Sequence, residues 1–414
     1  MRTTFPNTAP GLAQGGFEDG YEPLARRFAA NLDERAELGA AIAVYRRGVC
    51  VAHLWGGRAN VETGEPWGPD SRIVVFSVTK GFVAMALHLA AVRGCFEWDA
   101  PVGDIWPELR AAGKEAITFR QLFNHRGGLA AIDEPLTLEQ CMSPNARELV
   151  RGALERQRPA WQPGTNQGYH ALSFGLYARE VFERITGEPI GEFLRREIFE
   201  PLRSDARLGA RSYEDGRIAA LYPPSAAIRI GGMFGALAMG ASNEARVMRS
   251  ILERKSLTRR SFANPSSGRE GLVAYNGVAA RRAELPWASA TSSADGIARA
   301  YLPFSMGGEV AGKRFFDEKT LEPIYQRQSW SERDLVLQRP LGWSQGFLKE
   351  DVDVFSPNPE SFGHAGLGGA LGWCDPVAGV TVGYCMNRLD WRVRSPRALS
   401  LMRALYASPA LRDA

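Results

Sequence analysis

The residue pair best suited to chemistry is a serine and a lysine three positions apart, in Ser77-Val78-Thr79-Lys80. On an α-helix, residues at this spacing are neighbours, with roughly 5–6 Å between their Cβ atoms, so the amine can meet the hydroxyl. A serine hydroxyl is a poor nucleophile until a base takes its proton, and a lysine whose pKa is lowered by burial can do this. The start of a helix also stabilises a developing alkoxide. The spacing therefore predicts that Ser77 is a nucleophile activated by Lys80.

The segments around this pair predict a strand that runs directly into a buried helix. Residues 73–76 are apolar and strand-like, and apolar residues then recur with helical period from Ser77 to Arg93. The pattern ends at Gly94, a residue type that commonly stops helices. A Ser-x-x-Lys match is weak by itself, but Lys80 falls under the apolar stripe, where lysine is otherwise rare.

A second serine lies in a different motif, because residues 342–346 fit Gly-x-Ser-x-Gly. In α/β-hydrolases this motif places the nucleophile between a strand and a helix, and an acid and a histidine follow along the chain. Here the residues after Ser344 are extended in character, and His364 would crowd the whole triad into 20 residues. We therefore do not assign Ser344 as the nucleophile.

The rest of the chain predicts a mixed α/β (α+β) fold in which both chain ends build one antiparallel sheet flanked by helices. Residues 1–100 and 287–414 form this sheet domain, and residues 101–286 form an inserted, mostly helical domain. The expected strands are 41–45, 49–55, 369–374 and 380–386, and the expected flanking helices are 24–36 and 397–411.

Several segments resemble, in the right order, motifs of the serine β-lactamase and penicillin-binding protein superfamily. The resemblance is to its class C-like branch, and it is greatest to the family VIII carboxylesterases. It covers residues 70–390, and the fold expected from it is the β-lactamase/transpeptidase-like fold. The matching segments are FSVTKGF (76–82), LFNHRGGL (122–129), WQPG (161–164) with GYH (168–170), TSSADGIAR (291–299), GWSQGF (342–347) and FGHAG (362–366).

The resemblance implies roles for residues far from Ser77 in the sequence. Tyr169 matches the motif tyrosine beside the nucleophile, and we expect Lys80 to lower its pKa from about 10, so that it serves as base and then as acid. The backbone N–H groups of Ser77 and Leu367 would form the oxyanion hole. His364, Ala365 and Gly366 would flank the site as substrate-binding residues. His170 is expected to be a further substrate-binding residue that tunes the site, with exposure to solvent as the alternative.

Two departures from the family pattern bear on the substrate. His364 stands where the family has a lysine, so a fixed positive charge is replaced by a mostly neutral imidazole. Ala171 stands where the second motif has asparagine, which removes an amide that would bind an acylamide substrate. Both changes favour neutral esters over β-lactams and peptides.

The sequence thus predicts a carboxylesterase that cleaves small, neutral carboxylic esters through an acyl-enzyme on Ser77. Alternatives of the same fold are a β-lactamase or D,D-peptidase, and an acyltransferase in which an alcohol replaces water. An alternative of another class is a catalytically silent relative that binds acyl ligands.

Composition excludes other classes of function. The net charge of +4 over 414 residues is small and its basic residues are scattered, so we expect no nucleic-acid partner. The five histidines show no metal-binding spacing, and we expect neither a metal nor a cofactor. No apolar stretch is long enough to span a bilayer, and no secretory signal is recognised, so we expect a cytoplasmic protein without a membrane partner. The oligomeric state stays open. Five irregularly spaced cysteines are expected to be free thiols: Cys50, Cys95, Cys141, Cys374 and Cys385.

Overall fold

One ten-stranded antiparallel sheet joins the two ends of the chain, in the order β1-β2-β4-β3-β14-β13-β12-β11-β10-β9. The computed structural model describes residues 5–34, 37–211, 216–238, 240, 242–349 and 355–412. The N-terminal strands are β1 (Asn7–Thr8), β2 (Gln14–Phe17), β3 (Gly39–Arg46) and β4 (Val49–Gly57). The C-terminal strands are β9 (Ser329–Ser331), β10 (Leu341–Ser344), β11 (Phe347–Leu348), β12 (Phe362–Ala365), β13 (Leu371–Asp375) and β14 (Val380–Met386).

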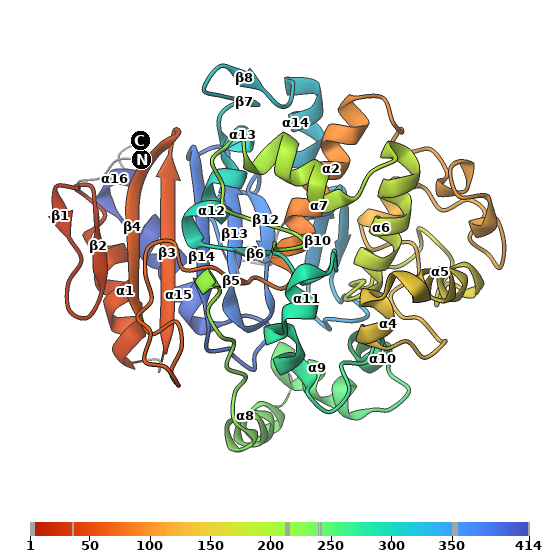
Figure 1. Cartoon of the computed structure of the whole chain (residues 1–414), viewed down its shortest axis with the longest axis horizontal. Coiled ribbons are helices and arrows are strands. Elements are labelled where there is room, and N and C mark those ends of the chain that lie inside the picture. The colour runs from red at the N-terminus through yellow and green to blue at the C-terminus, as the bar shows by residue number, and fades with distance from the viewer. Residues whose placement is uncertain are drawn as a thin grey trace.

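The pairing of β3 with β14 confirms the predicted fold class. It runs from Arg46 opposite Val380 to Ala40 opposite Met386, so strands more than 300 residues apart lie side by side (Figure 1). Both strands are almost wholly buried and rich in β-branched and small apolar residues, which is the composition of a strand at the centre of a sheet.

Helices from both chain ends cover this sheet. α1 (Glu22–Glu34) packs on β3 and β4, and α15 (Pro396–Tyr406) packs on α1. α2 (Val78–Val92) and α12 (Ala294–Ala300) approach the sheet closely at Gly372 and Gly383, which are opposite each other in β13 and β14. A Cβ at Gly383 would lie 2.0 Å from the Ala294 carbonyl oxygen, so only glycine allows this approach.

The regular elements that the structure describes between residues 101 and 286 are helices joined by loops, in the orange to green part of Figure 1. That this segment is an inserted domain is still a prediction. The boundaries at 100 and 286 stay a prediction. Its helices are α3 (Phe119–Phe123), α4 (Leu138–Met142), α5 (Arg147–Arg156), α6 (Ser173–Thr186), α7 (Ile190–Leu194), α8 (Ala226–Ala238), α9 (Asn243–Leu252), α10 (Leu257–Ala263) and α11 (Val278–Arg282).

The remaining elements are short and lie beside the main sheet. β5 (Ile73–Val74) pairs with β6 (Thr291–Ser292), and β7 (Glu309–Val310) pairs with β8 (Lys313–Arg314). The predicted helix over 397–411 is interrupted, because α15 ends at Tyr406 and Pro409 begins a separate short helix. The short helices are α13 (Leu302–Ser305), α14 (Glu318–Tyr325) and α16 (Pro409–Arg412).

A buried ion pair holds the turn that follows β12. The Arg397 guanidinium binds the Glu37 carboxylate, and both side chains are almost fully buried. The same guanidinium donates to the carbonyl of Gly368 (3.3 Å) and to the carbonyl of Arg388 (2.6 Å). This charge-assisted network fixes the turn at Leu367–Gly369, which lies at one edge of the site described next.

Candidate active site

Ser77 sits at a tight turn between β5 and α2. Phe76, the residue before it, has a positive φ of 45°, a conformation that costs free energy for a bulky side chain. Flanking hydrogen bonds hold the turn: the Val75 N–H donates to the Ala290 carbonyl (2.9 Å), and the Ala290 N–H donates to Thr79 Oγ1 (3.1 Å). The turn places the Ser77 side chain at the start of α2, where it lines a cavity.

Lys80 is fully buried directly below Ser77. Its Nζ lies 3.2 Å from Ser77 Oγ and donates to the Trp287 carbonyl oxygen at 3.1 Å. Burial lowers the pKa of the Lys80 amine well below its ordinary value, because no water solvates the ammonium form. A neutral amine with its lone pair beside a hydroxyl is a suitable proton acceptor.

Tyr169 approaches the same hydroxyl from the helical segment. Its Oη lies 3.0 Å from Ser77 Oγ. The phenol ring stacks on Trp343, with ring centroids 5.5 Å apart and planes only 6° apart. Two buried polar groups hold its backbone, since its N–H donates to the Asp334 carboxylate (3.0 Å) and its carbonyl accepts from Ser261 Oγ (3.2 Å).

The expected effect of Lys80 on the Tyr169 pKa is wrong for this arrangement. Burial of the phenol is the largest influence, and it raises the Tyr169 pKa. A neutral Lys80 has no charge with which to stabilise a phenolate, so the same desolvation that neutralises the amine keeps the tyrosine protonated. Lys80 is therefore the better proton acceptor of the two, and Tyr169 the better proton donor.

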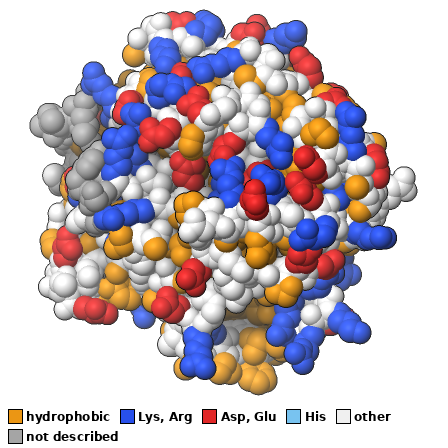
Figure 2. Space-filling model, turned by 45° about the vertical axis from the view of Figure 1, so that its right-hand side comes forward, with side chains coloured by type: hydrophobic (Ala, Val, Ile, Leu, Met, Phe, Trp, Pro, Cys, Tyr) orange, Lys and Arg blue, Asp and Glu red, His pale blue; other side chains and the backbone are white. Residues whose placement is uncertain are grey.

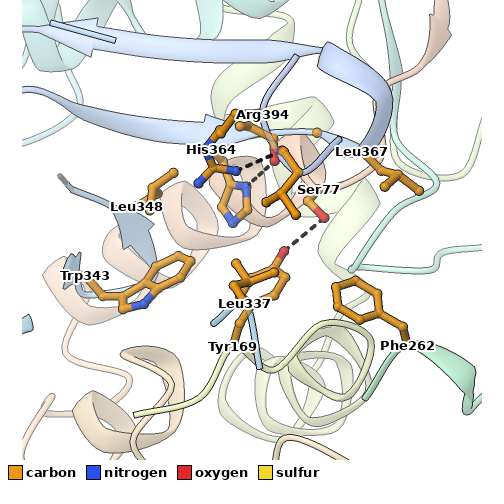
Figure 3. A pocket seen from close by; sticks show the side chains of 12 residues that line it. Ser77, Tyr169, Phe262, Leu337, Trp343, Leu348, His364, Leu367 and Arg394 are labelled. Carbon is orange, nitrogen blue, oxygen red and sulfur yellow. Dashed lines mark hydrogen bonds between the residues drawn. The ribbon is translucent and has the colours of Figure 1, made fainter. Parts of the chain in front are cut away.

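Leu367 begins the turn after β12 and lies beside Ser77 at the cavity (Figure 3). Ala365 and Gly366 line the same cavity. A Cβ at Gly366 would lie 2.4 Å from the Val75 carbonyl oxygen, so glycine is needed for this strand end to approach the turn before Ser77. Within the described residues, the N–H groups of Ser77 and Leu367 have no hydrogen-bond acceptor. Two such donors at one cavity suit a developing oxyanion.

His364 lies on β12 with its ring at the cavity wall, beside Arg394 (Figure 3). Its Nδ1 donates to the Ala365 carbonyl at 2.9 Å, and its buried Nε2 has no hydrogen-bond partner among the described residues. Burial is the largest influence on the His364 pKa and lowers it well below 6.5, so the imidazole is neutral as expected.

His170 lines neither of the cavities at Ser77, contrary to the expectation that it is a substrate-binding residue. Its Nδ1 donates to the Gly168 carbonyl (2.8 Å) and its Nε2 accepts from the Leu129 N–H (3.1 Å), so both ring nitrogens hold backbone segments together. Its own N–H donates to His125 Nδ1 (3.0 Å). Neighbouring residues in an extended segment point in opposite directions, and here Tyr169 alone faces Ser77.

Ser344 is placed as expected, away from any catalytic arrangement. It ends β10, and the turn at Gln345 and Gly346 leads into β11 and not into a helix. Its buried Oγ donates to the Pro323 carbonyl at 2.9 Å. Ser344 thus secures α14 to the sheet.

Two cavities meet at Ser77, Phe262 and Leu367. The smaller, of about 70 Å³, lies on the Tyr169 side, and the larger, of about 320 Å³, lies on the Ala171 side. The other residues of the smaller cavity are Leu337, Trp343, Leu348, His364, Ala365, Gly366, Val393 and Arg394. Those of the larger are Phe76, Ala171, Leu172, Ala263, Pro265, Ser266, Ser267, Gly268, Gly271, Leu272, Tyr275, Trp287 and Ala288.

The sequence did not predict most of the residues that line these two cavities. Trp343 lies inside a segment recognised for its resemblance, but nothing local to that segment indicates that its ring stacks on Tyr169. Arg394 and Phe262 come from a loop and a helix that carry no recognised motif.

The parts of the chain that the structure describes hold no group of three or more His, Cys, Asp or Glu side chains arranged for a metal ion. The five cysteines are unpaired. Among the described helices, none combines the length and the apolar character needed to cross a bilayer.

A serine hydroxyl at a helix start, with an amine one turn below it and a phenol from a distant segment of the chain, is the arrangement of a serine hydrolase with a transpeptidase-like fold. The model of the beta-lactamase family matches residues 24–406, so the chain belongs to that family.

Relatives over nearly the whole chain are named for two activities. The chain is 31% identical to "Esterase/beta-lactamase LipL" of Mycobacterium tuberculosis over 386 residues, which is 91% of this chain and 83% of that protein. The crystal structure of a family VIII carboxylesterase is 30% identical, covers 96% of this chain and 99% of its own, and superposes with a TM-score of 0.82. A penicillin-binding protein homologue from Caulobacter crescentus gives the same identity, coverage and TM-score.

The buried amine predicts a pH-dependent penalty on stability. The unfolded chain carries a protonated Lys80 below about pH 10.4, whereas burial lowers the pKa of the folded-state amine well below that value. Between the folded and unfolded pKa values the unfolded chain binds more protons, so wild-type stability rises with pH there, by up to about 1.4 kcal/mol per pH unit. Lys80→Met removes the penalty. We expect Lys80→Met to be more stable than wild type at pH 7, with a gain that shrinks as the pH rises toward 9.5.

Urea unfolding at several pH values measures this gain, and Lys313→Met, at an exposed lysine, is the matched control that should show no such slope. A gain from Lys80→Met that does not change with pH would mean that Lys80 is charged in the folded protein.

Proposed function

We propose that the protein is a carboxylesterase that hydrolyses small, neutral carboxylic esters through an acyl-enzyme on Ser77. The observation that carries this proposal is the convergence of an amine and a phenol, Lys80 Nζ at 3.2 Å and Tyr169 Oη at 3.0 Å, on one serine hydroxyl. The esterase and carboxylesterase names of relatives at 30–31% identity support it.

In the acylation half, Lys80 takes the Ser77 proton while Oγ attacks the ester carbonyl carbon. The carbonyl oxygen becomes an oxyanion, and the N–H groups of Ser77 and Leu367 stabilise it. When the tetrahedral intermediate collapses, Tyr169 gives its proton to the leaving alkoxide. The acyl-enzyme then faces a lysine ammonium and a tyrosine phenolate, whose opposite charges offset each other in the dry site.

The deacylation half restores both groups. The Tyr169 phenolate takes a proton from water as the water attacks the acyl carbon, and Lys80 returns its proton to Ser77 Oγ when the acid leaves. Each proton is therefore accounted for, and the chemistry requires no cofactor.

Neutral substrates suit the walls of the site. His364 presents an uncharged imidazole at the position where the family motif that the sequence resembles has a lysine. Its buried Nε2, which has no partner among the described residues, is available to bind a neutral acceptor or donor of the substrate. Ala171 offers no amide to an acylamide chain. The five cysteines are free thiols, which favours a reducing, cytoplasmic location for the protein. The proposed substrate is a small-molecule ester.

Arg394 gives specific support to one alternative. Its guanidinium belongs to the wall of the smaller cavity, beside His364, and would attract a substrate carboxylate of the kind that β-lactams and D,D-peptides carry. Turnover of nitrocefin at a rate comparable with p-nitrophenyl acetate would favour a β-lactamase over an esterase. An acyltransferase would instead form a new ester when an alcohol is added, at the expense of hydrolysis.

The nucleophile is tested by covalent labelling. We expect a fluorophosphonate probe to add one adduct to the wild-type protein, mapped to the peptide that contains Ser77 by mass spectrometry. Ser77→Ala should take no label and hydrolyse no ester, whereas Ser344→Ala should be labelled normally because its hydroxyl is buried against Pro323. An unlabelled wild-type protein would identify a catalytically silent relative.

The proton donor is tested by the leaving group. Tyr169→Phe should lower kcat/KM for ethyl or benzyl esters by about 10²-fold or more, because an alkoxide leaves only when protonated. For p-nitrophenyl esters the loss should be smaller, since p-nitrophenolate leaves without a proton. An equal loss for both ester types would show that Tyr169 only positions Ser77.

The two cavities are assigned by the position of Tyr169. The proton donor lines the smaller cavity, so the alcohol leaves there and the acyl chain occupies the larger, mostly apolar cavity. A leucine-to-tryptophan substitution can fill either cavity, because Leu272 lines the larger cavity and Leu337 lines the smaller one.

We expect Leu272→Trp to reduce kcat/KM for octanoate esters relative to acetate esters by about tenfold, the effect of a few displaced methylenes. Leu337→Trp should instead discriminate against bulky alcohols at a constant acyl chain. Kinetics on two matched ester series measure both ratios, and the reverse pattern would exchange the cavities.

A further inference from the structure

Helix α8 (Ala226–Ala238) is an apolar helix that packs against α9 but leaves most of its own surface exposed. Its sequence, AAIRIGGMFGALA, contains one charged residue, Arg229, and among its residues only Ala236 is buried. Ile228, Ile230 and Phe234 expose 46%, 51% and 65% of their surface. Figure 1 shows the helix projecting from the lower edge of the molecule.

The helix is nevertheless locally well defined. Ser225 Oγ accepts from the Ile228 N–H (3.3 Å) and so caps its first turn. Gly232 lies against the Trp391 ring, where a Cβ would fall 2.4 Å from a ring atom, and the carbonyl of Gly240 accepts from Arg249 of α9 (2.8 Å). α8 is thus attached along a narrow line, with its apolar side chains turned outward.

Exposed apolar side chains gather in this part of the chain. Of the 16 large apolar residues that are exposed among the described residues, half lie between 228 and 278. In a folded protein, exposed apolar patches of this kind mark a surface that interacts with another protein or with a membrane. The eight are Ile228, Ile230, Phe234, Ile251, Leu252, Phe262, Val273 and Val278.

The same segment is strongly basic. Residues 217–270 contain nine arginines and lysines but only three glutamates, whereas the whole chain has 50 basic and 46 acidic residues. Figure 2 shows the apolar patch at the lower edge of the molecule, with Lys and Arg side chains on both sides of it. A positive surface around an apolar helix is complementary to a negatively charged, apolar partner.

We propose that α8 and its basic surroundings dock on an anionic lipid surface, with the helix lying in the interface. Its 13 residues span about 20 Å, less than the roughly 30 Å of a bilayer core, so the helix can lie on a membrane but not cross it. Apolar side chains then enter the lipid, and the arginines meet anionic headgroups. A second copy of the chain fits less well, because it would bring two basic surfaces together.

Docking at this surface brings the active-site cavities close to the lipid. α9 packs against both α8 and α10, and Phe262 of α10 is an exposed residue that lines both cavities. A lipophilic ester dissolved in the membrane would then have a short path to the larger cavity.

The test uses the full chain with Ser77→Ala, so that binding is measured without catalysis. We expect it to float with vesicles of phosphatidylcholine containing phosphatidylglycerol, less with phosphatidylcholine alone, and less at high salt. Phe234→Asp should weaken binding by at least about tenfold, because it removes the phenyl group that would enter the lipid and adds a negative charge. Leu149→Asp, at an exposed apolar residue of α5, is the matched control and should bind normally.

The charge is tested separately by Arg229→Glu, which should weaken binding to the anionic vesicles but not to phosphatidylcholine. Arg314→Glu, at an exposed arginine of β8, is its control. In the catalytically intact chain, Phe234→Asp should hydrolyse p-nitrophenyl acetate as the wild type does, which shows that it folds.

Three outcomes would overturn the proposal. The first is no binding to anionic vesicles, and the second is an equal loss of vesicle binding in the test variants and their controls. The third is a dimer in light scattering that Phe234→Asp converts to a monomer. The last would show that a second copy covers α8. Since binding is measured on an inactive variant, a failure of the proposed esterase activity would leave this result unaffected.

Discussion

The site depends on one lysine amine buried without a carboxylate partner among the described residues. Removing an ammonium group from water is costly, and the protein avoids most of that cost by letting Lys80 lose its proton. The fold must still hold the amine there, which it does with the Trp287 carbonyl and the apolar residues of α2. An amine that would otherwise destabilise the core thus lies 3.2 Å from the Ser77 hydroxyl, where the proposed mechanism uses it as a base.

The same dry surroundings set the state of the other titratable groups. Burial lowers the pKa of His125 and His364 well below the ordinary value and raises the pKa of Tyr169. These three groups are therefore neutral in the resting site, whereas the Arg394 guanidinium remains a charged group in the wall of the smaller cavity. Low polarity around Ser77 would also strengthen the attraction between the proposed oxyanion and the N–H groups of Ser77 and Leu367.

Three distant parts of the chain supply these groups, and the sheet is what joins them. α2 carries Ser77 and Lys80, the helical segment brings Tyr169, and the turn after β12 brings Leu367. The Glu37–Arg397 pair links the N-terminal part of the sheet to that turn. Glycines at the closest approaches, Gly366 and Gly383 among them, allow these elements to meet without side chains between them.

The sequence by itself determined the helix that pairs Ser77 with Lys80, the strands at both chain ends and the order of the family motifs, because helical spacing and strand alternation are local properties. Only the tertiary structure decided which side chains face one another. His170 proved to bind backbone groups and Tyr169 to face Ser77, although they are neighbours in sequence. Burial by distant segments set the direction of the Tyr169 pKa, and Arg394 joined the cavity from a loop without a motif. Solvation and facing direction depend on every segment packed around a residue, and no local pattern contains that information.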